Sequence, residues 1–143
     1  MAQIESIEVN VQTLDVDGAE TDGSLYLGVC GREFHLDTRA NDLGQGSSGT
    51  YVLGDNANVQ EKAINDPRNQ KLLTENVDGF PVYLRFAGED EDDHWGLQRA
   101  VLTLNSQLLP QWDTISYIST TDGIFLGAKA GAIAFLIRDR DEG

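Results

Sequence analysis

The sequence predicts an all-β fold, an antiparallel β-sandwich of about eight short strands in two sheets. Apolar and polar side chains alternate over several short stretches, as expected for strands with one face turned to a core. Turns rich in glycine, aspartate or asparagine separate these stretches at fairly even spacing. Helical periodicity is missing between them, which disfavours alternating β and α units. A chain of 143 residues is expected to form one domain, residues 1–143, around one core.

The first part of the chain is predicted to hold four strands. Isoleucine and valine alternate with polar residues over 7–12, which predicts the first strand. Residues 24–37 are predicted to form a β-hairpin, with Gly31-Arg32 as its two-residue connection. A short strand is expected at 50–53.

The remaining strands follow a polar segment. Residues 54–76 are expected to hold at most one short helix, around Val59–Ile64. Strands are then predicted, in chain order, at 82–87, 97–105, 112–118, 123–126 and 132–138. The last two are expected to pair as a closing hairpin around the glycine-rich turn 127–131.

The chain carries a strong negative charge. It has 24 aspartates and glutamates against 10 lysines and arginines, which gives a formal net charge of -14. Proteins that bind nucleic acids present a basic face to the phosphates, and no basic stripe is present here, so that class is excluded. The same charge opposes direct docking on an anionic membrane unless a cation bridges the two surfaces.

Cysteine content and apolar run length narrow the class of protein further. Cys30 is the only cysteine, which excludes an internal disulfide framework and a cysteine-based zinc site, and it is expected to be a small buried residue. No stretch approaches the roughly 20 apolar residues of a membrane span. The first residues lack the basic region and apolar run of a signal peptide, so a cytoplasmic protein, or a domain cut from a larger one, is the expectation.

Acidic residues gather in three of the predicted loops, at 15–23, 37–42 and 89–94. Calcium takes oxygen ligands from carboxylates and backbone carbonyls on irregular backbone. Strand directions bring the first two loops to the same end of the sandwich, and the strand at 82–87 leads the third there as well. Gathered carboxylates repel one another unless a cation neutralises them. The loops therefore predict a calcium site, although solvated acidic turns have the same composition.

Three blocks of sequence also resemble a known family. The blocks are 16–27, then 34–37 with 41–42 and 47–51, then 82–86 with 94–101. In this order they resemble the PLAT or LH2 family, the lipoxygenase homology domain, over roughly 7–105. They are close to the version found in the membrane-binding C-terminal domain of clostridial phospholipase C. The resemblance implies an eight-stranded antiparallel sandwich that binds membranes or protein partners, often through calcium.

The resemblance also implies particular ligands. By motif position, the calcium ligands are Thr21, Asp22, Asp37, Asn41, Asp42, Asp93 and the backbone of His94. Asp17 completes this set after a one-residue shift, because the family's first-loop aspartate aligns with Gly18. Leu43, next to Asp42, is expected to dip into a membrane. The implied function is a calcium-binding module that contacts a lipid or membrane surface, or a partner protein, through its loaded loops.

Two alternatives remain open. Exposed tryptophan and tyrosine side chains on a sandwich stack on sugars, so a metal-free carbohydrate- or protein-binding module is the first alternative. Paired carboxylates also serve glycosidases, which keeps a hydrolase as the second. The sequence has no nucleophile elbow, phosphate loop or HExxH motif, so a role in binding rather than catalysis is expected. Trp95 is expected to pack in the core.

Overall fold

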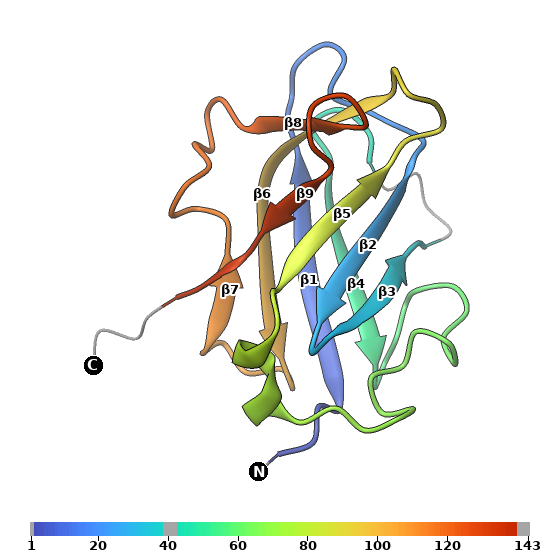
Figure 1. Cartoon of the computed structure of the whole chain (residues 1–143), viewed down its shortest axis with the longest axis vertical. Helices are drawn as coiled ribbons and strands as arrows, with labels where there is room; N and C mark the ends of the chain where they lie inside the picture. The colour runs from blue at the N-terminus through green and yellow to red at the C-terminus, as the bar shows by residue number, and fades with distance from the viewer. Residues whose placement is uncertain (1, 39–42, 140–143) are drawn as a thin grey trace.

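The structure, a computed structural model, describes residues 2–38 and 43–139. Its strands form two antiparallel sheets packed as a sandwich (Figure 1). The elements in the described residues are β1 (Ser6–Thr13), β2 (Ser24–Val29), β3 (Arg32–Leu36), β4 (Ser48–Gly54), the 3-10 helix η1 (Thr74–Gly79), β5 (Tyr83–Ala87), β6 (His94–Leu104), β7 (Gln111–Asp113), β8 (Ile124–Gly127), β9 (Ile133–Phe135) and β10 (Ile137–Arg138). The predicted all-β sandwich is confirmed, with ten short strands in place of about eight.

One sheet has six strands and the other has four. The larger sheet runs in the order β10-β7-β6-β1-β4, and β8 pairs with β6 beside this path. The smaller sheet runs β3-β2-β5-β9. In both sheets alternate side chains point into the space between the layers, as in β1, where Ile7, Val9 and Val11 are buried and Glu8 is exposed.

Trp95 on β6 lies at the centre of this core. Its side chain is fully buried, and its ring lies 6.1 Å from that of Phe86 on the facing sheet. The indole Nε1 donates a hydrogen bond of 2.9 Å to Oγ1 of Thr13, which is also buried. The indole N–H thus has a hydrogen-bond acceptor inside an apolar core. The expectation that Trp95 packs in the core is confirmed.

The β2–β3 hairpin turns one residue earlier than predicted. Its two-residue turn is Cys30-Gly31, with φ of 56° and 78°, while Arg32 already pairs with Val29 in the ladder. Positive φ at both central residues is the type I′ geometry that matches the twist of a hairpin. Cys30 is therefore only half-buried, and this partial burial raises the pKa of its thiol.

The segment after β4 covers one edge of each sheet, the β3 edge of the smaller sheet and the β4 edge of the larger one. The Asn65 amide accepts the backbone N–H of His35 on β3 at 2.9 Å. The Asn58 amide accepts the N–H of Val52 on β4 at 2.8 Å and donates to the Thr50 carbonyl oxygen at 2.8 Å. Because β3 and β4 are edge strands, these side chains block groups that would otherwise pair with another chain.

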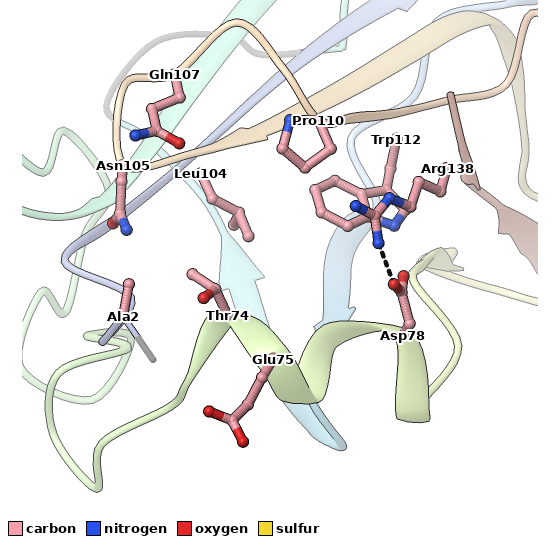
Figure 2. A pocket seen from close by; sticks show the side chains of 10 residues that line it. All are labelled: Ala2, Thr74, Glu75, Asp78, Leu104, Asn105, Gln107, Pro110, Trp112 and Arg138. Atoms are coloured by element: carbon pink, nitrogen blue, oxygen red, sulfur yellow. Dashed lines mark hydrogen bonds and ion pairs between the residues drawn. The ribbon is translucent and has the colours of Figure 1, made fainter. Parts of the chain in front are cut away.

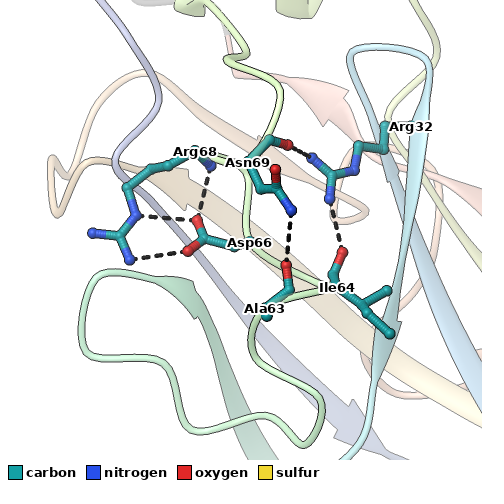
Figure 3. Close-up of polar contacts among 6 residues, drawn as sticks. All are labelled: Arg32, Ala63, Ile64, Asp66, Arg68 and Asn69. Atoms are coloured by element: carbon teal, nitrogen blue, oxygen red, sulfur yellow. Dashed lines mark hydrogen bonds and ion pairs between the residues drawn. The ribbon is translucent and has the colours of Figure 1, made fainter.

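Side-chain contacts hold this segment in place against the hairpin (Figure 3). Arg32 on β3 donates from Nη1 to the Asn69 carbonyl oxygen at 2.6 Å and from Nη2 to the Ile64 carbonyl oxygen at 2.7 Å. Arg68 forms a forked pair with Asp66, with two contacts of 3.0 Å. The segment thus folds as a series of fixed turns, although it contains no regular strand or α-helix.

The predicted helix at Val59–Ile64 is therefore wrong, and the one short helix of the described chain is η1, close to the end of the predicted region. Buried Val77 anchors η1 against the core. Within residues 2–38 and 43–139, no helix has the length and apolar character needed to cross a membrane.

The C-terminal strands pair differently from the prediction. β8 and β9 do not form a hairpin, because β8 pairs with β6 in the larger sheet and β9 pairs with β5 in the smaller one (Figure 1). The strand predicted at 112–118 ends at Asp113, because the Thr114 hydroxyl accepts the N–H of Ala100 and its carbonyl oxygen starts a turn. The chain then returns through β9 and β10, which connect the two sheets.

Candidate functional site

Three connections meet at the end of the sandwich that lies uppermost in Figure 1. They are the β1–β2 loop (14–23), the described part of the β3–β4 loop (37–38 and 43–47) and the β5–β6 loop (88–93). The antiparallel strand order brings them together, as the strand directions predicted. These three segments are called the acidic end below.

Thr21 and Asp93 join the first and third loops. The Thr21 hydroxyl lies 3.0 Å from each carboxylate oxygen of Asp93 and donates to that carboxylate, and it accepts the Gly23 N–H at 2.9 Å. The Asp93 carboxylate also accepts the N–H of Glu89 at 2.9 Å. Thr21 is only 7% exposed, so this contact lies under the surface of the loops. The Asp93 carboxylate is therefore held in one orientation by both loops.

The second loop joins the same cluster through its last residues. The Thr21 N–H donates to the Leu43 carbonyl oxygen at 3.2 Å, and the Gln45 amide donates to Asp15 at 3.2 Å. Leu43 itself is 5% exposed and packs in the hydrophobic core. The prediction that Leu43 dips into a membrane is therefore wrong, because its side chain already serves to anchor the loop.

The loops enclose an acidic depression of about 450 Å³. Its described lining consists of Glu20, Thr21, Asp22, Gly44, Gln45, Glu89 and Asp93. Four of these residues carry carboxylates and none is basic, whereas Lys129 lies outside the lining and pairs with Asp92 at 2.8 Å. The depression therefore concentrates negative charge beside amide, hydroxyl and backbone groups.

The structure brings together only some of the predicted ligands. Thr21, Asp22 and Asp93 line the depression, and Asp17 and Asp37 do not. Asp17 is exposed, and Asp37 is half-buried with its carbonyl oxygen accepting the Gln60 N–H at 2.8 Å.

Of the remaining predicted ligands, only His94 lies within the described residues. The His94 ring lies edge-on to Phe125 at 5.4 Å, and its Nδ1 is 3.2 Å from the carbonyl oxygen of Asp92. Asn41 and Asp42 lie outside the described residues.

The sequence alone did not identify Glu20, Glu89 and Gln45 as lining residues. The two glutamates belong to the acidic loops that predicted the site, so their composition was a usable signal. Gln45 lies in the glycine-rich stretch after Asp42, and no pattern distinguishes it from other loop amides.

The type of donor at the acidic end fits calcium, which takes carboxylate, amide and backbone oxygens. The fit does not extend to a finished cluster, because the part of the chain that the structure describes has no group of three or more Asp, Glu, His or Cys side chains placed to hold a metal ion. The depression thus has oxygen ligands of a suitable type, but its described acidic side chains are not placed to share one metal ion.

A second cavity, of about 360 Å³, lies at the opposite end of the sandwich (Figure 2). Trp112 and Leu104 form part of its wall, and Arg138 stands 5.7 Å from the Trp112 ring centre in an ion pair with Asp78. The Asn105 amide accepts the Glu5 N–H at 2.7 Å. Several of its polar groups are therefore already used within the protein.

Known structures share this fold, although no protein-family model and no curated protein matches the chain. The alpha toxin of Clostridium absonum superposes with a TM-score of 0.60 at 18% identity, over 93% of this chain and 31% of that one. The alpha-toxin of Clostridium perfringens from avian strain SWCP superposes with a TM-score of 0.62 at 18% identity, over 95% of this chain and 32% of that one. Coral 8R-lipoxygenase superposes with a TM-score of 0.56 at 17% identity, over 93% of this chain and 17% of that one. That protein is described as having calcium activation via a C2-like domain.

The chain therefore spans about a third or less of the length of these proteins. Clostridial toxins and lipoxygenases are among the proteins in which the likeness is found. The predicted resemblance to the lipoxygenase homology domain is confirmed at the level of the fold.

Proposed function

We propose that the chain is a calcium-responsive binding module whose acidic end contacts a lipid membrane surface. The observation that carries the proposal is the depression lined by four carboxylates, one of which, that of Asp93, is held by Thr21. In coral 8R-lipoxygenase, calcium activation is described via a C2-like domain, and the present chain superposes on 17% of that protein. A role in binding, rather than catalysis, is part of the same proposal.

Asp93 is the proposed central ligand because its carboxylate is already oriented. Thr21 and the Glu89 N–H fix it, while Asp22 stands on the same depression from the first loop. Glu20 and Gln45 supply further oxygens. Asn41 and Asp42, which the family resemblance implies as ligands, precede the anchored Leu43 directly in the chain. The proposal is that these groups share a calcium ion.

The electrostatic effect of calcium gives the module its response. Neighbouring carboxylates at the acidic end repel one another and also repel anionic headgroups, in a chain whose net charge is -14. Calcium supplies the positive charge that lowers both repulsions, and its hard oxygen preference extends to phosphate groups. The residues of this chain contribute orientation and charge, while the ion supplies the bridge to the headgroup.

Vesicle co-sedimentation tests the membrane part of this proposal. The protein is mixed with vesicles of phosphatidylcholine and phosphatidylserine in calcium, in magnesium or in EGTA. We expect it to pellet with the vesicles only in calcium, and Asp93→Asn to reduce the pelleted fraction. The matched control is Asp55→Asn, an exposed aspartate at the opposite end of β4, which should behave as wild type. Equal pelleting in calcium and EGTA, or none in either, contradicts the membrane proposal.

A further inference from the structure

The solvent-facing side of the four-stranded sheet carries an unusual set of side chains. The strand register places them in two rows, His35–Tyr26–Arg85–Ile133 and Glu33–Gly28–Tyr83–Phe135. The residues between them in the strands, such as Leu27, Phe34 and Leu84, are buried in the core. The two rows therefore form one outward surface, called the aromatic face below.

The first row is a stack of flat groups. The rings of Tyr26 and His35 lie 4.9 Å apart with an interplanar angle of 23°. The guanidinium carbon of Arg85 lies 4.2 Å from the centre of the Tyr26 ring. These contacts across three neighbouring strands hold the Tyr26 ring in place between its two neighbours.

The second row depends on a glycine. A β-carbon at Gly28 would overlap the ring of Tyr83, so the tyrosine lies over the position where a side chain is missing. Its hydroxyl reaches across to donate to the Glu33 carboxylate at 2.6 Å. Phe135 follows at the open edge of the sheet, 6.5 Å from the Tyr83 ring and 47% exposed.

An ion pair connects the two rows. Arg85 donates from Nε and Nη2 to the two oxygens of Glu33, each at 2.9 Å. Arg85 lowers the pKa of Glu33, and the hydrogen bond to Glu33 raises the pKa of Tyr83, so the carboxylate stays charged and the phenol stays protonated at neutral pH. A pair this exposed adds little to stability, but it fixes the orientation of both flat groups.

The face still has hydrogen-bonding capacity to offer a ligand. Within residues 2–38 and 43–139, neither Nη1 of Arg85 nor the ring nitrogens of His35 have a hydrogen-bond partner. The charges of Arg85 and Glu33 cancel locally, while the chain as a whole is strongly anionic. The surface therefore matches a neutral ligand that has apolar faces and polar edges, and it disfavours a polyanion such as nucleic acid.

We propose that the aromatic face binds a neutral oligosaccharide, independently of the acidic end. Sugar rings have apolar C–H faces, which stack on Tyr83 and Phe135, and hydroxyl edges, which meet Nη1 of Arg85 and the ring nitrogens of His35. Four neighbouring strands make the face about 14 Å wide, which accommodates a short run of sugar units. Because the rings are held before the ligand arrives, little ordering entropy is lost on binding.

The test is a titration followed by ¹H–¹⁵N correlation spectra, in EGTA so that the acidic end does not contribute. The probes are cellohexaose, laminarihexaose, xylohexaose and chitohexaose, added separately. We expect at least one to shift the amides of β2, β3, β5 and β9. Phe135→Ala, which removes a stacking ring, and Tyr26→Ala, which removes the ring that holds Arg85 and His35 in place, should each weaken its binding roughly tenfold. The matched control is Phe125→Ala, an exposed aromatic on β8 of the other sheet, which should bind as wild type.

The spectra also show whether each variant is folded, and Phe135, at an exposed sheet edge, keeps the test valid if Tyr26→Ala unfolds. The proposal is overturned if none of the four oligosaccharides shifts the face, or if the shifts survive Phe135→Ala unchanged. Shifts produced at these strands by a peptide, with none from the sugars, would also overturn it in favour of a protein partner. Since calcium is absent throughout, failure here leaves the proposed calcium function untouched.

Discussion

The hydroxyl of Thr21 lies 3.0 Å from both carboxylate oxygens of Asp93, and the two residues are 72 positions apart in the chain. This contact joins the β1–β2 loop to the β5–β6 loop, while the Thr21 N–H holds the β3–β4 loop through Leu43. One threonine thus connects all three loops of the acidic end. It also orients the carboxylate that the proposed calcium site depends on most.

Replacement of Thr21 by valine removes this link while preserving the shape of the side chain. We expect Thr21→Val to lower the free energy of unfolding by about 1–2 kcal/mol without calcium, because Asp93 and the Gly23 N–H each lose a partner. Urea denaturation measures the change. Thr121→Val, at an exposed turn, is the control and should leave stability unchanged. A wild-type value for Thr21→Val would show that the loops do not depend on the contact.

The buried hydrogen bond between Trp95 and Thr13 predicts a larger loss. Thr13→Val leaves the indole N–H without its acceptor inside the core, which should cost about 1–3 kcal/mol. Thermal and urea unfolding, followed by the fluorescence of the tryptophans, measure it. Since valine and threonine have the same shape, a loss well below this range would mean that the indole finds another acceptor.

The edge-covering role of Asn65 gives a third prediction. Asn65→Ala removes the acceptor of the His35 N–H and two donors to the backbone of Gln60 and Glu61. We expect a loss of about 1–3 kcal/mol in stability, together with self-association through the uncovered edge of β3. Unfolding and sedimentation velocity measure the two effects. Asn76→Ala, an exposed residue of η1, is the control, and a monomeric, fully stable Asn65→Ala would contradict the role.

The Glu33–Arg85 pair predicts a dependence of stability on pH. Arg85 lowers the pKa of Glu33 below its ordinary value of 4.5 in the folded protein. The pair therefore stabilises the fold fully above about pH 4.5, and this contribution is lost as the pH falls through the folded-state pKa. Asp66 beside Arg68 has a lowered pKa and acts in the same direction.

Removal of the Arg85 guanidinium tests whether the pair causes this dependence of stability on pH. Arg85→Met should lose less stability than the wild type when the pH is lowered from about 7 to about 3, because the largest cause of the lowered Glu33 pKa is then removed and only the Tyr83 hydrogen bond still lowers it. Urea midpoints at several pH values measure this difference. Lys62→Met is an exposed control that should follow the wild type. Identical acid losses in Arg85→Met and wild type would rule out the pair as a source of the dependence.

Local pattern predicted the strands well and their partners less well. The alternation at 7–12 correctly located β1, and the strand directions correctly brought the acidic loops to one end. The β8–β9 hairpin was wrong because a glycine-rich turn between two strands says nothing about which sheet each will join. Leu43 was misplaced for a related reason, since only tertiary packing decides whether a loop leucine faces solvent or the core.

The position of the hairpin turn, the role of two loop asparagines and the aromatic face also escape prediction from sequence, each for a physical reason. The predicted hairpin turn lies one residue too late because Cys30 is not a residue type that favours a positive φ, whereas the strand pairing requires a positive φ at that position. Asn58 and Asn65 resemble ordinary loop asparagines in sequence, and only the strand edges reveal their function. Likewise, the aromatic face depends on register across four strands, which the pattern of any one strand does not contain.

The central claim is that the acidic end binds calcium, and titration calorimetry with calcium alone tests it most directly. We predict a saturable binding isotherm for the wild type that Asp93→Asn weakens by tenfold or more, roughly the effect of losing one charged ligand. Asp55→Asn should reproduce the wild-type isotherm. No heat of binding at calcium concentrations up to about a millimolar, or an isotherm that Asp93→Asn leaves unchanged, would contradict the account.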